Sequence, residues 1–161
     1  MYIFFDVDGV LNSFITLSEG RLSDRYIRNL IGLVKLYNGK LVLISTRRYG
    51  FDRGFFGRLK PISPQCKLLV DKLKKHNVKI YDLLPESPNE NRAEEIKEYI
   101  NEKRIKEFII IDDEPFNYKK LDLKENLVNT HFSNANDRAD EGFSEKRFRN
   151  AKAIISKIYH I

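Results

Sequence analysis

Two short apolar runs, far apart in the chain, each end in a pair of acidic residues. They are residues 2–5, followed by Asp6 and Asp8, and residues 107–111, followed by Asp112 and Asp113. Runs of this length, rich in aromatic and β-branched residues, are typical of buried strands. Side chains two positions apart along a strand point the same way, so we expect Asp6 and Asp8 to face one spot. Their charges would repel each other there unless a cation bound them or one of them held a proton.

Strand and helix patterns alternate along the rest of the chain. Apolar residues at helical spacing predict four helices, and further apolar runs predict three more strands. The expected helices cover residues 25–37, 64–76, 90–103 or 92–103, and 145–158, and the further strands cover 40–44, 78–81 and 126–130. Asn89 and Asn91 are the two candidate caps of the third helix. Strand, helix and buried strand in succession predict an α/β fold with a parallel sheet.

The length of the chain favours a single domain over residues 1–161. The alternation of strands and helices supports this, because no internal repeat, low-complexity tract or linker interrupts it. Residues 49–64 follow neither pattern and place glycines among phenylalanines and basic residues. We expect them to form a long loop or small flap beside the second strand, at the sheet edge where α/β folds bind their ligands.

Charge and composition narrow the choice of partner and compartment. The 29 Lys and Arg against 23 Asp and Glu give a formal charge of +6. This charge suits a phosphorylated or polyanionic partner, although a solvated basic face is an equally ordinary explanation.

The single cysteine, Cys66, has no internal disulfide partner. No leader and no run of about 20 apolar residues is present, which predicts a cytoplasmic protein without a membrane partner. The sequence does not indicate an oligomeric state.

Parallel strands align their C-terminal ends at one edge, so Asp6, Asp8, Ser45, Asp112 and Asp113 are expected to converge. Several carboxylates at one edge suit Mg²⁺, which is bound through a few carboxylates and phosphate oxygens. A phosphate neutralised in this way can be attacked by an aspartate, giving an aspartyl-phosphate intermediate. Asp8 is then the candidate for moving protons, and the Ser45 hydroxyl for contacting a phosphoryl oxygen. A cation for the remaining phosphate charge is still required.

These residues resemble, in order and spacing, the motifs of the haloacid dehalogenase (HAD) superfamily of phosphatases. The resemblance covers essentially the whole chain and implies a nucleophile at Asp6 and an acid/base at Asp8. It also implies a phosphate contact at Ser45 and a Mg²⁺ site completed by Asp112 and Asp113. The implied fold is a three-layer Rossmann-like fold with a five-stranded parallel sheet of order 5-4-1-2-3. Short connections after the first and third strands look like the type with minimal or no cap.

The third motif of that superfamily is a basic residue, usually lysine, near the helix that precedes the acidic strand. Here Arg92 fits best and Lys97 second. On the residues alone, Arg92 is more often a solvated residue of the first helical turn. The resemblance favours Arg92 as the phosphate-binding cation.

Within the superfamily, Ser45-Thr46-Arg47 resembles the Ser-Gly-Arg of the phosphatase domain of polynucleotide kinase phosphatases. The wider pattern looks like the small HAD domains of RNA-repair proteins. This likeness implies phosphate binding by Ser45, Thr46, Arg47 and Arg92, and a substrate at RNA or DNA ends. The basic aromatic stretch 47–60 agrees, since arginines can meet phosphates and phenylalanines can stack on bases. Packing within the loop is the more common role of such phenylalanines.

Other classes of protein share some of these features. A response-regulator receiver and a Toprim-type nuclease also combine acids with an α/β fold, but the order of acids differs from both. A receiver places adjacent acids after its first strand, and a Toprim domain has a glutamate strand ahead of its Asp-x-Asp. A small-molecule phosphatase of the same fold, or a non-catalytic module that binds nucleic acid or protein, are the alternatives that the sequence leaves open.

Overall fold

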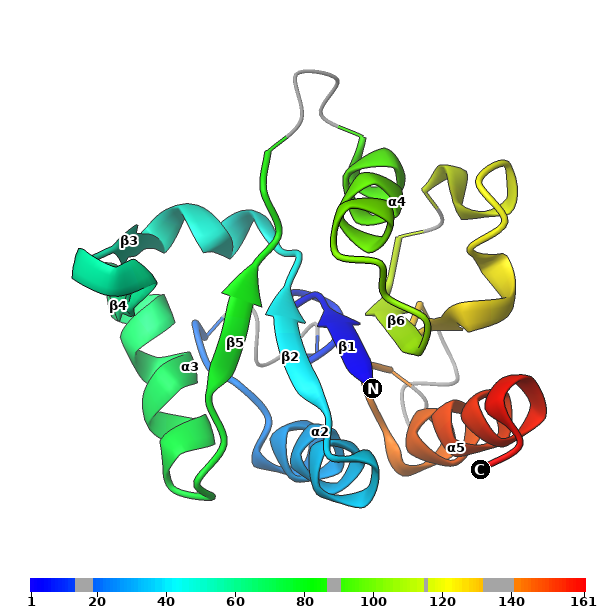
Figure 1. Ribbon diagram of the computed structural model, residues 1–161. Coiled ribbons are helices and arrows are strands. Elements are labelled where there is room, and N and C mark those ends of the chain that lie inside the picture. The colour runs from blue at the N-terminus through cyan, green and yellow to red at the C-terminus, as the bar shows by residue number, and fades with distance from the viewer. Residues whose placement is uncertain (14–18, 87–90, 115, 132–140) are drawn as a thin grey trace.

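A five-stranded parallel sheet forms the centre of the computed structural model (Figure 1), which describes residues 1–13, 19–86, 91–114, 116–131 and 141–161. Its strands are β1 (Tyr2–Phe5), β2 (Lys40–Leu43), β5 (Ile80–Leu83), β6 (Phe108–Asp112) and β7 (Leu127–Asn129). Their order is β5-β2-β1-β6-β7, and each neighbouring pair is parallel. The order predicted from the resemblance is therefore confirmed.

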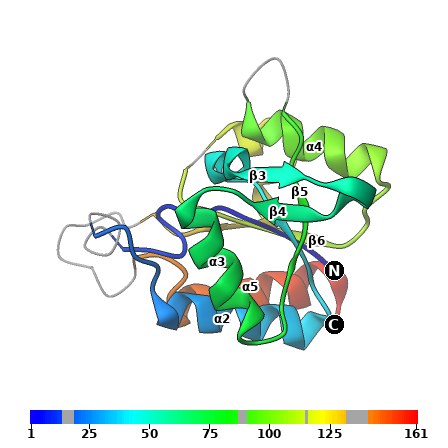
Figure 2. The ribbon, with the colours of Figure 1, turned by 90° about the vertical axis from the view of Figure 1, so that its left-hand side faces the viewer.

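Helices cover both faces of the sheet and give three layers (Figure 2). One face packs against α2 (Asp24–Tyr37), α3 (Pro64–Lys74) and α5 (Glu145–Tyr159), and the other packs against α4 (Arg92–Glu102). Ile3 and Phe5 enter the first core, whereas Phe4 between them enters the second. This alternation explains why the central strands are apolar throughout: both of their faces are buried.

The ends of the helices follow from local hydrogen bonding. The Ser23 hydroxyl accepts a hydrogen bond from the Tyr26 amide at the start of α2, and Asn38 ends that helix in the left-handed conformation. Asn91 caps α4 by accepting from the amides of Ala93 and Glu94. Asn89, the alternative cap, lies outside the described residues.

The segment after β2 differs most from the prediction. It contains the 3₁₀ helix η1 (Thr46–Gly50), β3 (Phe51–Arg53), the 3₁₀ helix η2 (Phe55–Gly57) and β4 (Leu59–Pro61). β3 and β4 pair antiparallel, so part of the expected loop is a two-stranded ribbon. Elsewhere in the described chain, the short 3₁₀ helices η3 (Asn117–Lys119) and η4 (Lys124–Asn126) lie between β6 and β7.

The third sheet strand begins later than predicted. The amide of Val78 donates to the carbonyl of Leu73, which extends the turn after α3, and pairing with β2 starts at Ile80. Among the described residues, no helix combines the length and apolarity needed to cross a membrane.

Candidate active site

Asp6 and Asp112 lie side by side because the strands that carry them are paired. Phe5 is opposite Ile111 in the register of β1 and β6, and the amide of Asp6 donates to the carbonyl of Ile111 at 2.9 Å. On the other side of β1, the amide of Ile44 donates to the carbonyl of Phe5 at 3.0 Å. Parallel pairing therefore places the residues that follow β1, β2 and β6 at one edge of the sheet.

Three carboxylates gather at this edge. Asp6, Asp112 and Asp113 each offer one oxygen, and these oxygens lie within 4.8 Å of one another. Asp6 is 5% exposed and Asp112 is fully buried. The Asp8 carboxylate is not part of this group, so the structure brings together three of the four expected metal ligands through their side chains.

Arg92, at the start of α4, supplies the positive charge that faces the three acids. Its Nη1 lies 2.9 and 3.1 Å from the two oxygens of Asp112 and 3.6 Å from an oxygen of Asp6. The Tyr118 hydroxyl also donates to Asp112, at 2.6 Å. For Lys97, five residues further along α4, the described residues provide no such contact. The geometry favours Arg92 of the two sequence candidates.

Asp8 is held by a different arginine. Arg47 Nε donates to one Asp8 oxygen at 3.1 Å, and its Nη2 donates to the other at 2.6 Å. The Asn12 side-chain amide donates to Asp8 at 2.8 Å. Asp8 is thereby fixed at the mouth of the site, with a carboxylate that is 40% exposed.

Of the two neighbouring hydroxyls after β2, Ser45 is the one inside the site. Its side chain is 1% exposed, hydrogen-bonds with Asp6 and accepts a hydrogen bond from the Arg47 amide at 3.2 Å. Thr46 is exposed. The Ser45 side chain therefore both contacts Asp6 and starts the 3₁₀ turn that carries Arg47.

The pKa values of the acids in the site are shifted in different directions. Burial raises the pKa of Asp6 to about 7, with Asp112 adding to the rise and Arg92 opposing it. Burial and the neighbouring Asp112 raise the pKa of Asp113 to about 6. For Asp8, burial also acts upward, but the hydrogen bonds from Arg47 and Asn12 outweigh it and lower the pKa. Two of the clustered acids thus resist ionisation without further positive charge, whereas Asp8 is stabilised as a carboxylate.

Gly9 lets the chain turn tightly directly after Asp8, where the backbone packs against Asp113. Its φ is +73°, and a Cβ at this position would lie 2.2 Å from an Asp113 oxygen. Its carbonyl accepts a hydrogen bond from the Thr130 hydroxyl, and its amide donates to the Asn12 side chain. Only glycine combines this backbone conformation with so close an approach.

Sequence reasoning missed three of these residues. Asn12 follows Asp8 by four positions in a turn, a spacing that could have suggested the contact. Tyr118 and Thr130 carry no such signal, because each reaches the site from a segment that follows β6. Both act on site groups that the sequence did identify.

The donor set fits Mg²⁺. Carboxylate oxygens of Asp6, Asp112 and Asp113 are hard ligands, and a divalent cation would favour the ionised forms of Asp6 and Asp113, whose pKa values are raised by burial and by Asp112. The group contains no cysteine or histidine, so it does not have the usual composition of a zinc site.

A doubly covered parallel sheet of this order, with an Asp-x-Asp after its first strand and an acidic pair after its fourth, defines a HAD-superfamily domain. Residues 2–148 match the family described as the HAD domain in Swiss Army Knife RNA repair proteins, and the chain belongs to that family. Searches of curated proteins and of solved structures gave no match.

Proposed function

We propose that this protein is a Mg²⁺-dependent phosphomonoester hydrolase that forms an aspartyl phosphate and acts on nucleic-acid ends. The observation that carries the proposal is the surrounding of Asp6: a buried carboxylate beside Asp112, with Arg92 and Ser45 in contact. Membership of a HAD family supports a phosphatase-type hydrolase. The buried carboxylate at the end of β1 is the nucleophile of this mechanism.

Bound by Asp6, Asp112 and Asp113, Mg²⁺ would neutralise phosphate oxygens and let a carboxylate approach them. An oxygen of Asp6 attacks phosphorus, and the bond to the leaving oxygen breaks. Asp8, protonated once Arg47 has moved from it to the phosphate, gives its proton to that oxygen and later takes one from the water that hydrolyses the aspartyl phosphate. Arg92, Ser45 and Arg47 bind the phosphoryl oxygens, and the exposed Thr46 is the further phosphate contact expected from the sequence.

The choice of nucleic-acid ends rests on three observations of different kinds. The family is described by its occurrence in RNA repair proteins. The chain has a formal charge of +6. Arg47 lies at the open side of the site beside the half-exposed Asp8, where an arginine fork can meet a phosphate on a long substrate.

Steady-state hydrolysis of p-nitrophenyl phosphate tests the enzyme activity. We expect turnover with Mg²⁺, its loss in EDTA, and no activity in Asp6→Asn. Asp8→Asn should be slower by about 10²–10⁴-fold and should accumulate a phosphoenzyme that Asp6→Asn cannot form. Wild type that matches Asp6→Asn on a panel of phosphorylated compounds, nucleic-acid ends included, would instead indicate a non-catalytic binding module.

Competition between substrates tests the substrate class. A 3′-phosphorylated oligonucleotide should have a higher kcat/KM than the corresponding mononucleotide, and this preference should weaken as salt rises. Equal kcat/KM values at all salt concentrations would identify a small-molecule phosphatase.

A further inference from the structure

A groove of about 1170 Å³ lies between the β3–β4 ribbon, α3 and the edge strand β5, on the side of the molecule that faces the viewer in Figure 2. Its apolar residues come from all three elements and include Leu59, Val70, Leu73 and Ile80. β5 pairs with β2 along one edge only, so this groove runs beside the open edge of the sheet.

Positively charged side chains line the groove, and Asp52, which lies opposite Lys60 in the register of the ribbon, is outside its lining. Arg58, Lys60, Lys74 and Lys79 are among its lining residues, and Asp and Glu are absent from them. All four side chains are exposed, and none forms an ion pair within the part of the chain that the structure describes. Four unpaired cations around an apolar floor favour a ligand that is both polyanionic and rich in apolar surface.

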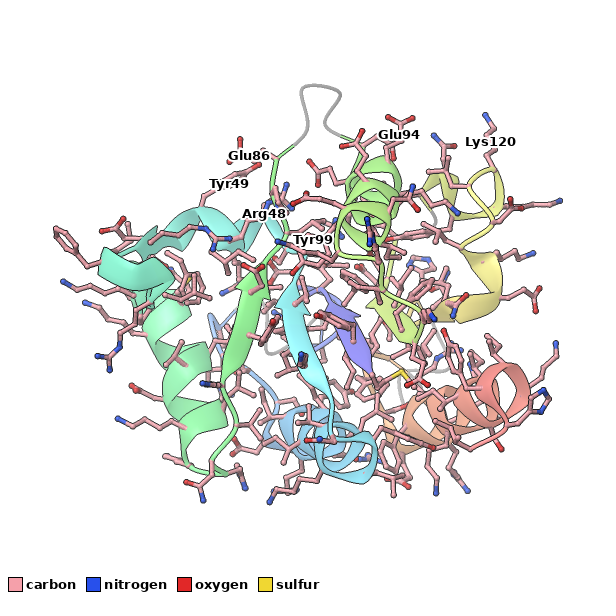
Figure 3. The ribbon with its side chains drawn as sticks, in the orientation of Figure 1. Arg48, Tyr49, Glu86, Glu94, Tyr99 and Lys120 are labelled. Atoms are coloured by element: carbon pink, nitrogen blue, oxygen red, sulfur yellow. The ribbon has the colours of Figure 1, made fainter. Side chains whose placement is uncertain are left out.

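A neighbouring cavity has a different charge pattern. The second cavity, of about 670 Å³, lies between η1 and α4, where Figure 3 shows Arg48, Tyr49, Glu86 and Tyr99. Its lining contains acids as well as bases, namely Asp82, Glu86 and Glu102 with Arg48, Arg53 and Lys103. A polyanion is therefore favoured by the groove and not by this cavity.

Phe55 gives the groove an aromatic platform. It lies on η2 between the two strands of the ribbon, lines the groove, and is 94% exposed. Phe51, at the start of the same ribbon, is 9% exposed and packs in the core. Of the ribbon phenylalanines whose side chains the structure describes, Phe51 anchors the ribbon and Phe55 faces solvent, where a base can stack.

The groove is joined to the candidate active site by a single turn. η1 carries Arg47, which contacts Asp8, and is followed directly by Phe51, which lines the groove. We propose that the groove binds single-stranded nucleic acid, the strand whose phosphorylated end enters the site. The link to the end rests on the proposed function, whereas strand binding itself does not. An acidic peptide would meet the same cations, but it presents no series of flat rings to Phe55.

Binding is measured by fluorescence anisotropy with labelled 12-nucleotide RNA and DNA strands that lack a terminal phosphate. Both strands should bind wild type, with an affinity that falls as salt rises. The ratio of the two dissociation constants tells whether RNA or DNA is preferred. Phe55→Ala should weaken binding about tenfold. Arg58→Gln with Lys60→Gln should reduce the slope of log K against log salt by about 0.7 for each phosphate that is no longer neutralised.

Matched controls carry the same chemical changes elsewhere. Leu36→Ala removes another exposed apolar side chain, which is 55% exposed on α2. Lys106→Gln with Lys120→Gln removes two exposed charges, and Figure 3 shows Lys120 across the molecule from the ribbon. We expect both controls to bind like wild type. All these variants should hydrolyse p-nitrophenyl phosphate like wild type.

The groove and the proposed function can fail separately. Strands that do not bind wild type, or that bind the groove variants and wild type equally, would overturn the groove proposal even if p-nitrophenyl phosphate is hydrolysed. A glutamate-rich peptide that binds as tightly as the strands and loses affinity equally in Phe55→Ala would overturn it as well. Groove-dependent binding without any phosphatase activity would leave the groove standing and refute the enzyme.

Discussion

Arg47 and Asp8 form a two-pronged ion pair across the mouth of the site, with contacts of 2.6 and 3.1 Å. The pair joins the residue expected to move protons to the turn that follows the neighbouring strand. A phosphate that enters the site offers Arg47 a second anion of matching shape. If the guanidinium moved from Asp8 to the phosphate, Asp8 would lie beside the substrate without its cation. Phosphate binding would in this way make Asp8 available for proton transfer.

The first prediction concerns this arginine. Arg47→Ala should raise the KM for p-nitrophenyl phosphate at least tenfold and weaken inhibition by inorganic phosphate to a similar degree, because the fork that meets the phosphate is removed. Arg47→Lys keeps the positive charge but not the two-pronged guanidinium. Its KM and its inhibition by phosphate should lie between those of wild type and Arg47→Ala. Steady-state kinetics with phosphate as inhibitor measures both effects. Arg25→Ala, on the exposed side of α2, is the control; equal KM values for Arg47→Ala and wild type would contradict the prediction.

The second prediction separates the two candidates for the third-motif cation. Arg92→Gln should abolish most activity and should lower the free energy of unfolding by on the order of 3 kcal/mol, since it leaves the buried Asp112 without its ion-pair partner. Lys97→Gln, on the same helix, should change the free energy of unfolding by less than about 0.5 kcal/mol. Urea unfolding and kcat/KM measure the two effects. A larger loss of activity in Lys97→Gln than in Arg92→Gln would reverse the assignment.

The third prediction is a pH dependence at the edge of the sheet. Asp82 accepts hydrogen bonds from Tyr99 and Arg53, which outweigh burial and lower its pKa. A lowered pKa in the folded state stabilises the protein above the ordinary pKa of 3.8, and this stabilisation is lost as pH falls below it. Asp82→Asn should therefore melt about 2–4 °C below wild type at pH 7, corresponding to about 1 kcal/mol. The difference should shrink below pH 4.

Thermal melting of both proteins from pH 3 to pH 7 measures this dependence. Asp52→Asn, an exposed acid on the nearby strand β3, is the control and should melt like wild type throughout. A melting difference for Asp82→Asn that stays constant down to pH 3 would show that the charge of Asp82 does not stabilise the fold.

The acids at the sheet edge could be predicted because their placement follows from strand direction alone. Asp6 and Asp112 each directly follow the buried part of a parallel strand, so the register that pairs Phe5 with Ile111 also brings the two carboxylates together. The four helices and the strand order follow from the same short-range patterns and from the family resemblance. The role of each site residue stays a prediction, as does the single-domain organisation.

The remaining features depend on contacts between distant segments. The ribbon over residues 51–61 has strands of three residues, too short for a period of two to stand out among its glycines. Tyr118 reaches Asp112 from a 3₁₀ turn that no local pattern marks. The Asp8 carboxylate points to Arg47, and not into the group of three acids, because Arg47 and Asn12 together hold it there. The alternation of side chains along a strand does not indicate these contacts of Asp8 with Arg47 and Asn12.

The last prediction concerns the turn at Gly9. Gly9→Ala places a methyl group where an Asp113 oxygen now lies, at 2.2 Å, and also puts alanine at a φ of +73°. The backbone cost is about 1–2 kcal/mol. The collision should in addition displace Asp113 and so weaken Mg²⁺ binding and lower activity.

Gly20→Ala is the matched control for this turn, because Gly20 has a φ of +66° and no atom of the described residues lies within 4 Å of its Cβ position. It should lose similar stability, with unchanged dependence of activity on Mg²⁺. Chemical unfolding and Mg²⁺ titrations of activity separate the two effects. Equal Mg²⁺ dependence in both variants would show that Asp113 does not contribute to the cation site.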